Sequence, residues 1–279
     1  FFLNRAWMLS KGLAHAIRQN DEEQWQTLTW NPPGTPVAAL DAVTIGVSKR
    51  VAPGAFCAFE FRLRTLTAQP ELPAGSSLIW SCVFPMKAEM EIPPEGFLHL
   101  SQPQKFKGIE LVQKKQFRIE KAMLSGDSAA RRLLLTPESA VTIGEGWKDW
   151  QQELRWEPQA ALERLKAHQP GPFDLDIELQ EEIVLNGWSI GKGEANERDQ
   201  VVDFPLETEG MHLTARVAVH DETLLKALEK LRKLEKRPPL YGVMHYEMCR
   251  FFLQPLTVFD DKGPDYISLT KGSVGAAAL

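Results

Sequence analysis

The sequence is poor in the residues that mark disulfide frameworks and zinc sites. Its three cysteines, Cys57, Cys82 and Cys249, lie far apart and form no CxxC pair. A sparse and odd set argues against both kinds of site. All three occupy apolar, strand-like stretches, so we expect buried free thiols, which persist in a reducing compartment. The sequence therefore predicts a cytoplasmic protein.

Several catalytic and nucleotide-binding motifs are also missing. The six histidines show no HxH or HExxH spacing, and no GxSxG or GxGxxG motif occurs. Gly191-Lys192-Gly193 lacks the spacing of a phosphate-binding Walker loop, so 191–200 is predicted to be an exposed connection. No apolar run approaches the roughly 18 residues that cross a bilayer, which predicts that the protein does not enter membranes.

What the sequence does have is an ordinary globular composition with uneven charge. It contains 279 residues, of which 43% are hydrophobic and 25% are charged, enough for one large domain or two small ones. The formal net charge of −5 argues against nucleic-acid binding through the overall field. Residues 1–121 carry 14 basic and 11 acidic side chains, whereas 122–279 carry 18 and 26. A local basic face therefore remains compatible with the composition.

Two segments show the two-residue period of a strand with one apolar and one charged face. In 55–66, Cys57, Phe59, Phe61 and Leu63 alternate with Ala58, Glu60, Arg62 and Arg64. In 173–180, Phe173, Leu175, Ile177 and Leu179 alternate with Asp174, Asp176, Glu178 and Gln180. We expect the apolar side chains to point into a core and the charged ones to face water. Shorter strands are predicted at 97–100, 108–113 and 116–120.

Helical periodicity appears in three places. Residues 4–18 repeat apolar side chains on one face, and 158–168 begins with a proline in its first turn. Asp221 is placed to cap a third helix that extends to about Lys236 with its leucines inward. The segment 122–170 is otherwise irregular, and Pro137-Glu138 is a candidate helix start.

This order of elements predicts an α+β fold of predominantly antiparallel β-sheet with flanking helices, because strand–helix–strand alternation is rare. No obvious flexible linker divides the chain. We therefore expect a single integrated α+β domain over 1–279, with 1–121 and 122–279 as possible subdomains.

The first candidate site is the basic stretch 105–121. Its basic residues are Lys105, Lys107, Lys114, Lys115, Arg118 and Lys121, against Glu110 and Glu120. Phe106 and Phe117 interleave with them, as stacking side chains do in single-strand binders, although on a strand such residues more often face the core. The stretch predicts a nucleic-acid site, an acidic protein partner, or a plain solvated face.

The second candidate site is the acidic face of 173–182. Asp174, Asp176 and Glu178 would project from the same side of a strand, where their oxygens could bind a divalent cation. Two of them could also serve as an acid and a base. A solvated strand face, which discourages edge pairing, explains the same pattern.

These observations lead to three functional hypotheses. We favour a non-enzymatic binding or scaffold subunit of a larger, bacterial-type intracellular assembly, with a protein partner and no cofactor. It rests on the missing catalytic motifs, the segregated charge and the eight Trp and fourteen Phe, since aromatic side chains favour contact surfaces. The alternatives are a nucleic-acid-binding module that uses 105–121 and a metal-dependent hydrolase that uses Asp174, Asp176 and Glu178.

Overall fold

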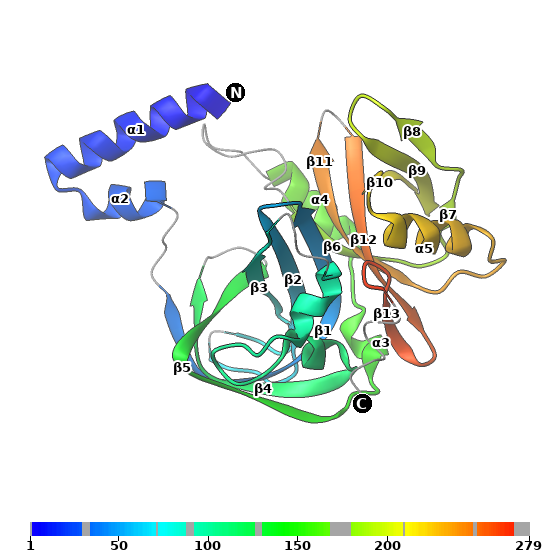
Figure 1. Cartoon of the computed structure of the whole chain (residues 1–279), viewed down its shortest axis with the longest axis horizontal. Coiled ribbons are helices and arrows are strands. Elements are labelled where there is room, and N and C mark those ends of the chain that lie inside the picture. The colour runs from blue at the N-terminus through cyan, green and yellow to red at the C-terminus, as the bar shows by residue number, and fades with distance from the viewer. Residues whose placement is uncertain are drawn as a thin grey trace.

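The computed structural model describes residues 2–29, 34–70, 72–87, 92–125, 130–167, 180–208, 210–247 and 250–270. Antiparallel pairing predominates in its sheets, and the helices lie at their margins (Figure 1). The predicted α+β class is therefore confirmed. No helix within the described ranges is long and apolar enough to cross a membrane.

The first half of the chain forms a closed barrel, which we call the first barrel. Its strands are β1 (Thr35–Ala52), β2 (Phe56–Thr65), β3 (Ser77–Pro85), β4 (Lys115–Ser125) and β5 (Ala130–Gly146), in the order β1-β2-β3-β5-β4. All pairs are antiparallel except β3 with β5. Two 3₁₀ helices, η1 (Pro94–His99) and η2 (Gly108–Val112), connect β3 to β4. A five-stranded Greek-key barrel is the architecture of the OB-fold.

The second half forms another sheet, which we call the second sheet. It contains β6 (Gln180–Leu185), β7 (Ser189–Ile190), β9 (Val201–Thr208), β10 (Met211–Ala218), β11 (Leu240–Glu247) and β12 (Arg250–Asp260). Two short strands, β8 (Glu194–Asn196) and β13 (Gly263–Tyr266), pair with β9 and β12. Helix α5 (Glu222–Arg232) connects β10 to β11.

The second sheet repeats the strand order of the first barrel. Its order is β6-β11-β12-β10-β9-β7, and only residues 186–188 separate β6 from β7, the two ends of the sheet. With β6 and β7 read as one bent first strand, both sheets have the order first-second-third-fifth-fourth. Both place one parallel pair between the third and fifth strands, here β10 with β12. The chain thus contains two OB-type units whose sequences show no repeat.

Helix α5 begins where predicted, but it ends at Arg232 rather than at about Lys236, and Leu234 beyond its end is exposed instead of inward. Asp221 accepts a hydrogen bond from the Leu224 backbone N–H at 3.1 Å, and this cap fixes the start of the helix. Leu224, Leu228 and Leu231 are buried in the core of the second sheet. The proline-initiated helix is also confirmed, as α4 (Pro158–Ala167), and a short α3 (Trp150–Glu153) precedes it.

A shared apolar cluster joins the first barrel to the second sheet. Val43 and Ile45 on the outer side of β1 pack with Tyr241, Val243 and Leu256. The Tyr266 hydroxyl donates to the Thr44 carbonyl at 2.8 Å, which ties β13 to β1. One integrated domain over 1–279 stays a prediction, which this cluster supports. A division after residue 121 would cut β4, whereas a division after Gly146 would leave both sheets whole.

The charged face of β2 does not meet water as predicted. Phe59 and Phe61 point into the barrel as expected, but Arg62 and Arg64 are only 4% and 9% exposed. The second sheet covers them, with Glu182 of β6 as a partner of both guanidinium groups. A two-residue period identifies the two faces of a strand, but it cannot tell whether another sheet covers the polar face.

Three local predictions are wrong. Residues 97–100 and 108–113 lie in or around η1 and η2 rather than in strands. Pro137 starts no helix, because it lies inside β5. The β4–β5 register shifts between Glu120 and Ala122, and Ser139 donates to the Lys121 carbonyl at 2.7 Å. Proline is tolerated at such an irregular position in a strand, where the ladder is interrupted.

Candidate binding surfaces

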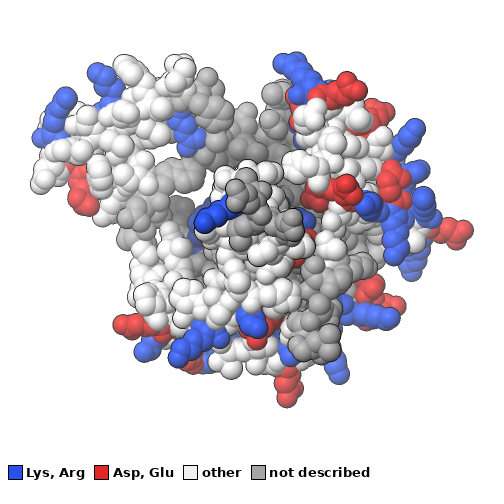
Figure 2. Space-filling model, in the orientation of Figure 1, with Lys and Arg blue, Asp and Glu red and all other residues white. Residues whose placement is uncertain are grey.

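The first candidate surface is a helical hairpin at the start of the chain. It consists of α1 (Phe2–Gln19) and α2 (Glu22–Thr29), and the two helices make their main contact with each other among the described elements. Asp21 accepts a hydrogen bond from the Gln24 backbone N–H at 2.9 Å and caps α2. Figures 1 and 2 show the hairpin as a lobe set apart from both sheets.

Large apolar side chains are exposed on this hairpin. The exposed fractions are 87% for Leu3, 64% for Trp7, 63% for Ile17 and 37% for Trp25. Single exposed apolar residues are normal, but a cluster on one element marks an interaction site. The sequence predicted the helix at 4–18 correctly. It missed the surface, because the spacing of apolar residues does not reveal which face remains uncovered.

The predicted basic stretch is spread over several elements. Lys105 and Lys107 lie between η1 and η2, Lys114 lies between η2 and β4, and Lys115 and Arg118 lie in β4. Lys114 donates to the Lys262 carbonyl at 3.0 Å. Arg118 contacts carboxylate oxygens of Asp41 at 3.3 Å and Glu120 at 3.2 Å, so its charge is largely compensated. These lysines as a binding site remain a prediction.

The aromatic residues between these lysines are not stacking platforms. Phe106 and Phe117 are 3% and 1% exposed and belong to the core of the first barrel. The core interpretation of the two phenylalanines is therefore correct, and a nucleic acid at this face would lack base stacking from them.

The predicted acidic ligands Asp174, Asp176 and Glu178 lie outside the described residues. Their neighbours Glu181 and Glu182 are described, and both form ion pairs, with Arg164 and with Arg62 and Arg64 respectively. Within the described part of the chain, no group of three or more His, Cys, Asp or Glu side chains could hold a metal ion. The metal site stays a prediction.

The ion pairs of Glu182 form a buried cluster between the two sheets. Glu182 lies 3.1 Å from Arg64 and 3.6 Å from Arg62, and it accepts a hydrogen bond from Ser77 at 2.8 Å. Glu60 lies 2.6 Å from Arg62. Burial lowers the pKa of Arg62, but Glu60 and Glu182 outweigh it, so the pKa is raised. Two guanidinium groups face two carboxylates, an arrangement that balances charge without leaving a reactive group.

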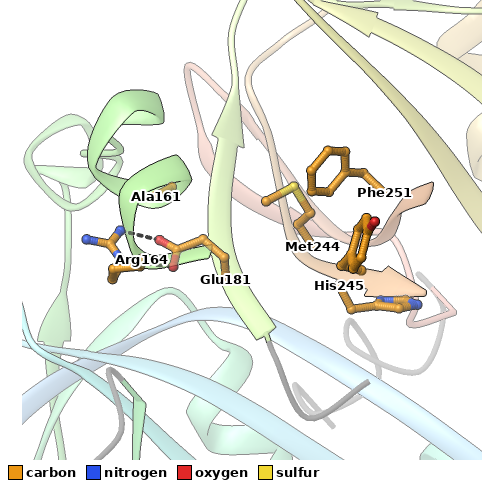
Figure 3. Close-up of a pocket in the computed structure, with 7 residues that line it drawn as sticks. Ala161, Arg164, Glu181, Met244, His245 and Phe251 are labelled. Atoms are coloured by element: carbon orange, nitrogen blue, oxygen red, sulfur yellow. Dashed lines mark hydrogen bonds and ion pairs between the residues drawn. The ribbon is translucent and has the colours of Figure 1, made fainter. Parts of the chain in front are cut away.

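Beside this cluster, at the other side of β6, is a shallow pocket (Figure 3). It is lined by Ala161, Arg164, Glu181, Met244, His245, Tyr246 and Phe251. Figure 3 shows the Arg164–Glu181 pair on one side and Met244, His245 and Phe251 on the other. Its two oppositely charged groups bind each other, which leaves a mainly apolar depression rather than a catalytic arrangement.

The polar loop 191–200 is an exposed connection, as predicted, and it contains β8. Its glycines do not form an open phosphate cradle. Gly191 donates its backbone N–H to the Pro205 carbonyl at 2.8 Å, and a Cβ on Gly193 would lie 2.7 Å from the Phe204 ring. The glycines therefore allow this loop to pack closely on β9.

On the outer face of the second sheet, the guanidinium group of Arg216 covers the aromatic ring of Phe252. Arg216 lies over the Phe252 ring at 4.0 Å and is held by Asp203 at 2.9 Å, while His245 stacks on Phe252 from β11. Phe252 is only 3% exposed. The contacts among Asp203, Arg216, Phe252 and His245 stabilise this face and leave no exposed aromatic ring on which a ligand could stack.

No family model and no curated protein matches the chain. Among solved structures, similarity extends to an Ifi202 HINa domain in complex with 20bp dsDNA, with a TM-score of 0.39, 10% identity and coverage of 79% of this chain and 94% of that chain. A murine DNA binding protein bound with ds DNA has a TM-score of 0.32 and 11% identity, with coverage of 78% of this chain and 90% of that chain. The tetrameric p202 HIN2 has a TM-score of 0.30 and 7% identity, with coverage of 84% of this chain and 94% of that chain. At these TM-scores the likeness assigns no family, and the description of the fold rests on the strand pairing of this chain.

Proposed function

We propose that this protein is a non-enzymatic binding or scaffold subunit of a multi-component assembly in the cytoplasm, and that its α1–α2 hairpin binds a protein partner. The observation that carries the proposal is the exposure of Leu3, Trp7 and Ile17 on a hairpin that stands apart from both sheets. Aromatic and aliphatic side chains of this kind form the buried centres of protein interfaces. The buried thiols of Cys57 and Cys82 support the reducing compartment.

The experiment isolates the native complex from the source cells through a tag at the far end of the chain. A Trp7→Glu, Ile17→Glu variant should lose its partner while keeping the thermal unfolding of the wild type, because both side chains are already exposed. The matched control is Leu134→Glu, Val83→Glu, which changes two exposed apolar residues of the first barrel. A complex that survives the hairpin substitutions but not the barrel substitutions would refute the proposal.

A second candidate function is nucleic-acid binding by the first barrel. Two observations favour it: the OB-type strand order, an architecture that binds oligonucleotides, and the exposure of Lys105 and Lys107 in the segment that leads to Lys114 and Lys115. Replacement of these four lysines by Glu should abolish binding, and wild-type affinity should fall steeply with salt. The control replaces four exposed lysines around α5, Lys226, Lys230, Lys233 and Lys236, which changes the net charge equally. If both variants lost nucleic-acid affinity equally, the effect would come from net charge rather than from a site on the first barrel.

The metal-dependent hydrolase remains a third proposal that depends on Asp174, Asp176 and Glu178. It requires calorimetric binding of Mg²⁺ or Mn²⁺ that disappears when the three residues become Asn, Asn and Gln. The absence of binding at millimolar metal would end it.

A further inference from the structure

One side of α1 carries a stripe with the spacing of a coiled-coil seam. Leu3, Trp7, Ser10, Ala14 and Ile17 follow one another at intervals of four and three residues. This alternation keeps side chains on one line of a helix and suits pairing with a second helix. We call these five residues the outer stripe. Its three large members are 63% exposed or more.

The opposite side of α1 is the one that packs on α2. Ala16 is 1% exposed, and a Cβ on Gly12 would lie 2.8 Å from a methyl carbon of Leu28, so the two helices approach closely there. Within a helix, residues 12 and 16 lie on the side away from residues 3, 10 and 17. The hairpin therefore buries one side of α1 internally and leaves Leu3, Trp7, Ser10 and Ile17 of the outer stripe exposed, with Ala14 partly exposed between them.

The sizes of the stripe residues make it complementary to itself. Large residues stand at positions 3, 7 and 17, and small ones at 10 and 14. If two copies of α1 lie antiparallel about Ser10, Leu3 is level with Ile17 and Ser10 with Ser10. The stripe residue nearest to Trp7 is then Ala14 of the other copy, which is one residue out of level with it. We propose, on the basis of the proposed function, that the protein bound by the hairpin is a second copy of this chain, held by two antiparallel α1 helices about a two-fold axis at Ser10.

A parallel pair fits less well. Each stripe residue would then meet its own copy, so that Trp7 would face Trp7 and Ala14 would face Ala14. The first contact is overpacked and the second leaves a void, and both are unfavourable. The antiparallel arrangement places the bulk of each indole over the small side chain of Ala14. It also gives the self-complementary patch that a two-fold symmetric dimer requires.

The charges beside the stripe predict how the dimer responds to salt. Within 2–19, α1 carries Arg5, Lys11 and Arg18 and no acidic residue. Lys11 lies 5.5 Å from the Trp7 ring centre and at the edge of the stripe, so the antiparallel pair brings the two Lys11 side chains near each other. Salt screens this repulsion, so dimerisation should strengthen with ionic strength. Lys11→Gln should strengthen it at low salt.

The test exchanges the two residues that the antiparallel arrangement pairs, in the full chain. Analytical ultracentrifugation over a concentration series should show a wild-type dimer. Trp7→Ala and Ala14→Trp should each weaken it by at least about tenfold, which corresponds to about 1.4 kcal/mol. The double variant Trp7→Ala, Ala14→Trp should restore it, because an indole then faces a methyl group again, with the two positions exchanged. Failure of the double exchange to restore the dimer overturns the antiparallel arrangement.

A cysteine at the axis gives an independent readout. Ser10→Cys should form a disulfide-linked dimer under mild oxidation, whereas Thr27→Cys on the exposed side of α2 should not. A chain that is monomeric at every concentration, or that instead sediments with lipid vesicles, overturns the inference. If the monomeric chain still loses its native complex in the Trp7→Glu, Ile17→Glu variant, the proposed function stands and the partner is another protein. If the chain is monomeric and the Trp7→Glu, Ile17→Glu variant keeps its native complex, both the proposed function and the proposed dimer are wrong.

Discussion

Tyr241 of the second sheet lies directly against the backbone of Gly46 in the first barrel. A Cβ on Gly46 would lie 2.5 Å from a ring carbon of Tyr241, and the β1–β2 register shifts just before Gly46. The absence of a side chain at this position is what allows the two sheets to approach so closely.

We expect Gly46→Ala to destabilise the whole chain. The added methyl group would displace a fully buried ring, and overpacking of this kind costs typically about 1–3 kcal/mol. Chemical denaturation measures the loss. Gly146→Ala is the matched control, because a Cβ there has no atom within 4 Å. Equal stabilities of the two variants would mean that the Tyr241 ring moves freely aside.

Loss of the Glu182 carboxylate should be far more harmful than loss of the adjacent Glu181 carboxylate. Glu182→Gln leaves Arg62 and Arg64 in a buried site with half of their compensating charge, and breaking a buried ion pair costs about 3–5 kcal/mol. Glu181→Gln breaks a pair with Arg164, which is 50% exposed, and should cost less than about 1 kcal/mol. Urea unfolding of both variants tests this, and similar small losses would show that water reaches the two guanidinium groups.

The protein should lose stability in acid partly through Glu95. Burial raises the pKa of this carboxyl, but the hydrogen bond and charge of Lys49 at 2.9 Å outweigh burial and lower the pKa. Because the pKa is lower in the folded state, ionised Glu95 stabilises the fold fully above its unfolded value of about 4.3. This contribution is lost as pH falls through the lower folded-state value.

The measurement for Glu95 is unfolding free energy against pH. Glu95→Gln should flatten the acid limb below about pH 5 relative to wild type, whereas Glu138→Gln, at an exposed position, should leave its slope unchanged. If the unfolding free energy of the Glu95→Gln variant fell with decreasing pH as steeply as that of the wild type, the loss of stability in acid would come from other carboxylates.

The two described thiols should be unreactive in the folded protein. Burial raises the pKa of Cys57 to about 11, with Lys49 opposing it, and burial raises the pKa of Cys82 to about 12. Since the thiolate is the reactive form, a Cys249→Ser variant should react with a thiol reagent at pH 8 only after unfolding. Rapid reaction under native conditions would show that the first barrel opens readily.

Local patterns in the sequence determined several elements of this fold. The alternation in 55–66, the apolar face of 4–18 and the cap at Asp221 each predicted the right kind of element, because periodicity and capping act within a few residues. The mixed α+β class follows from their order. The same patterns failed at 97–100, 108–113 and Pro137, where contacts with the rest of the barrel set the backbone.

The tertiary structure alone decided which faces are covered. Arg62 and Arg64 read as solvent-facing, yet the second sheet buries them against Glu182, over a hundred residues away. The spacing of apolar residues placed Ile17 on the apolar face of its helix, yet its side chain remains exposed. Burial depends on what lies opposite a side chain in space, and the period of a single segment carries no information about that neighbour.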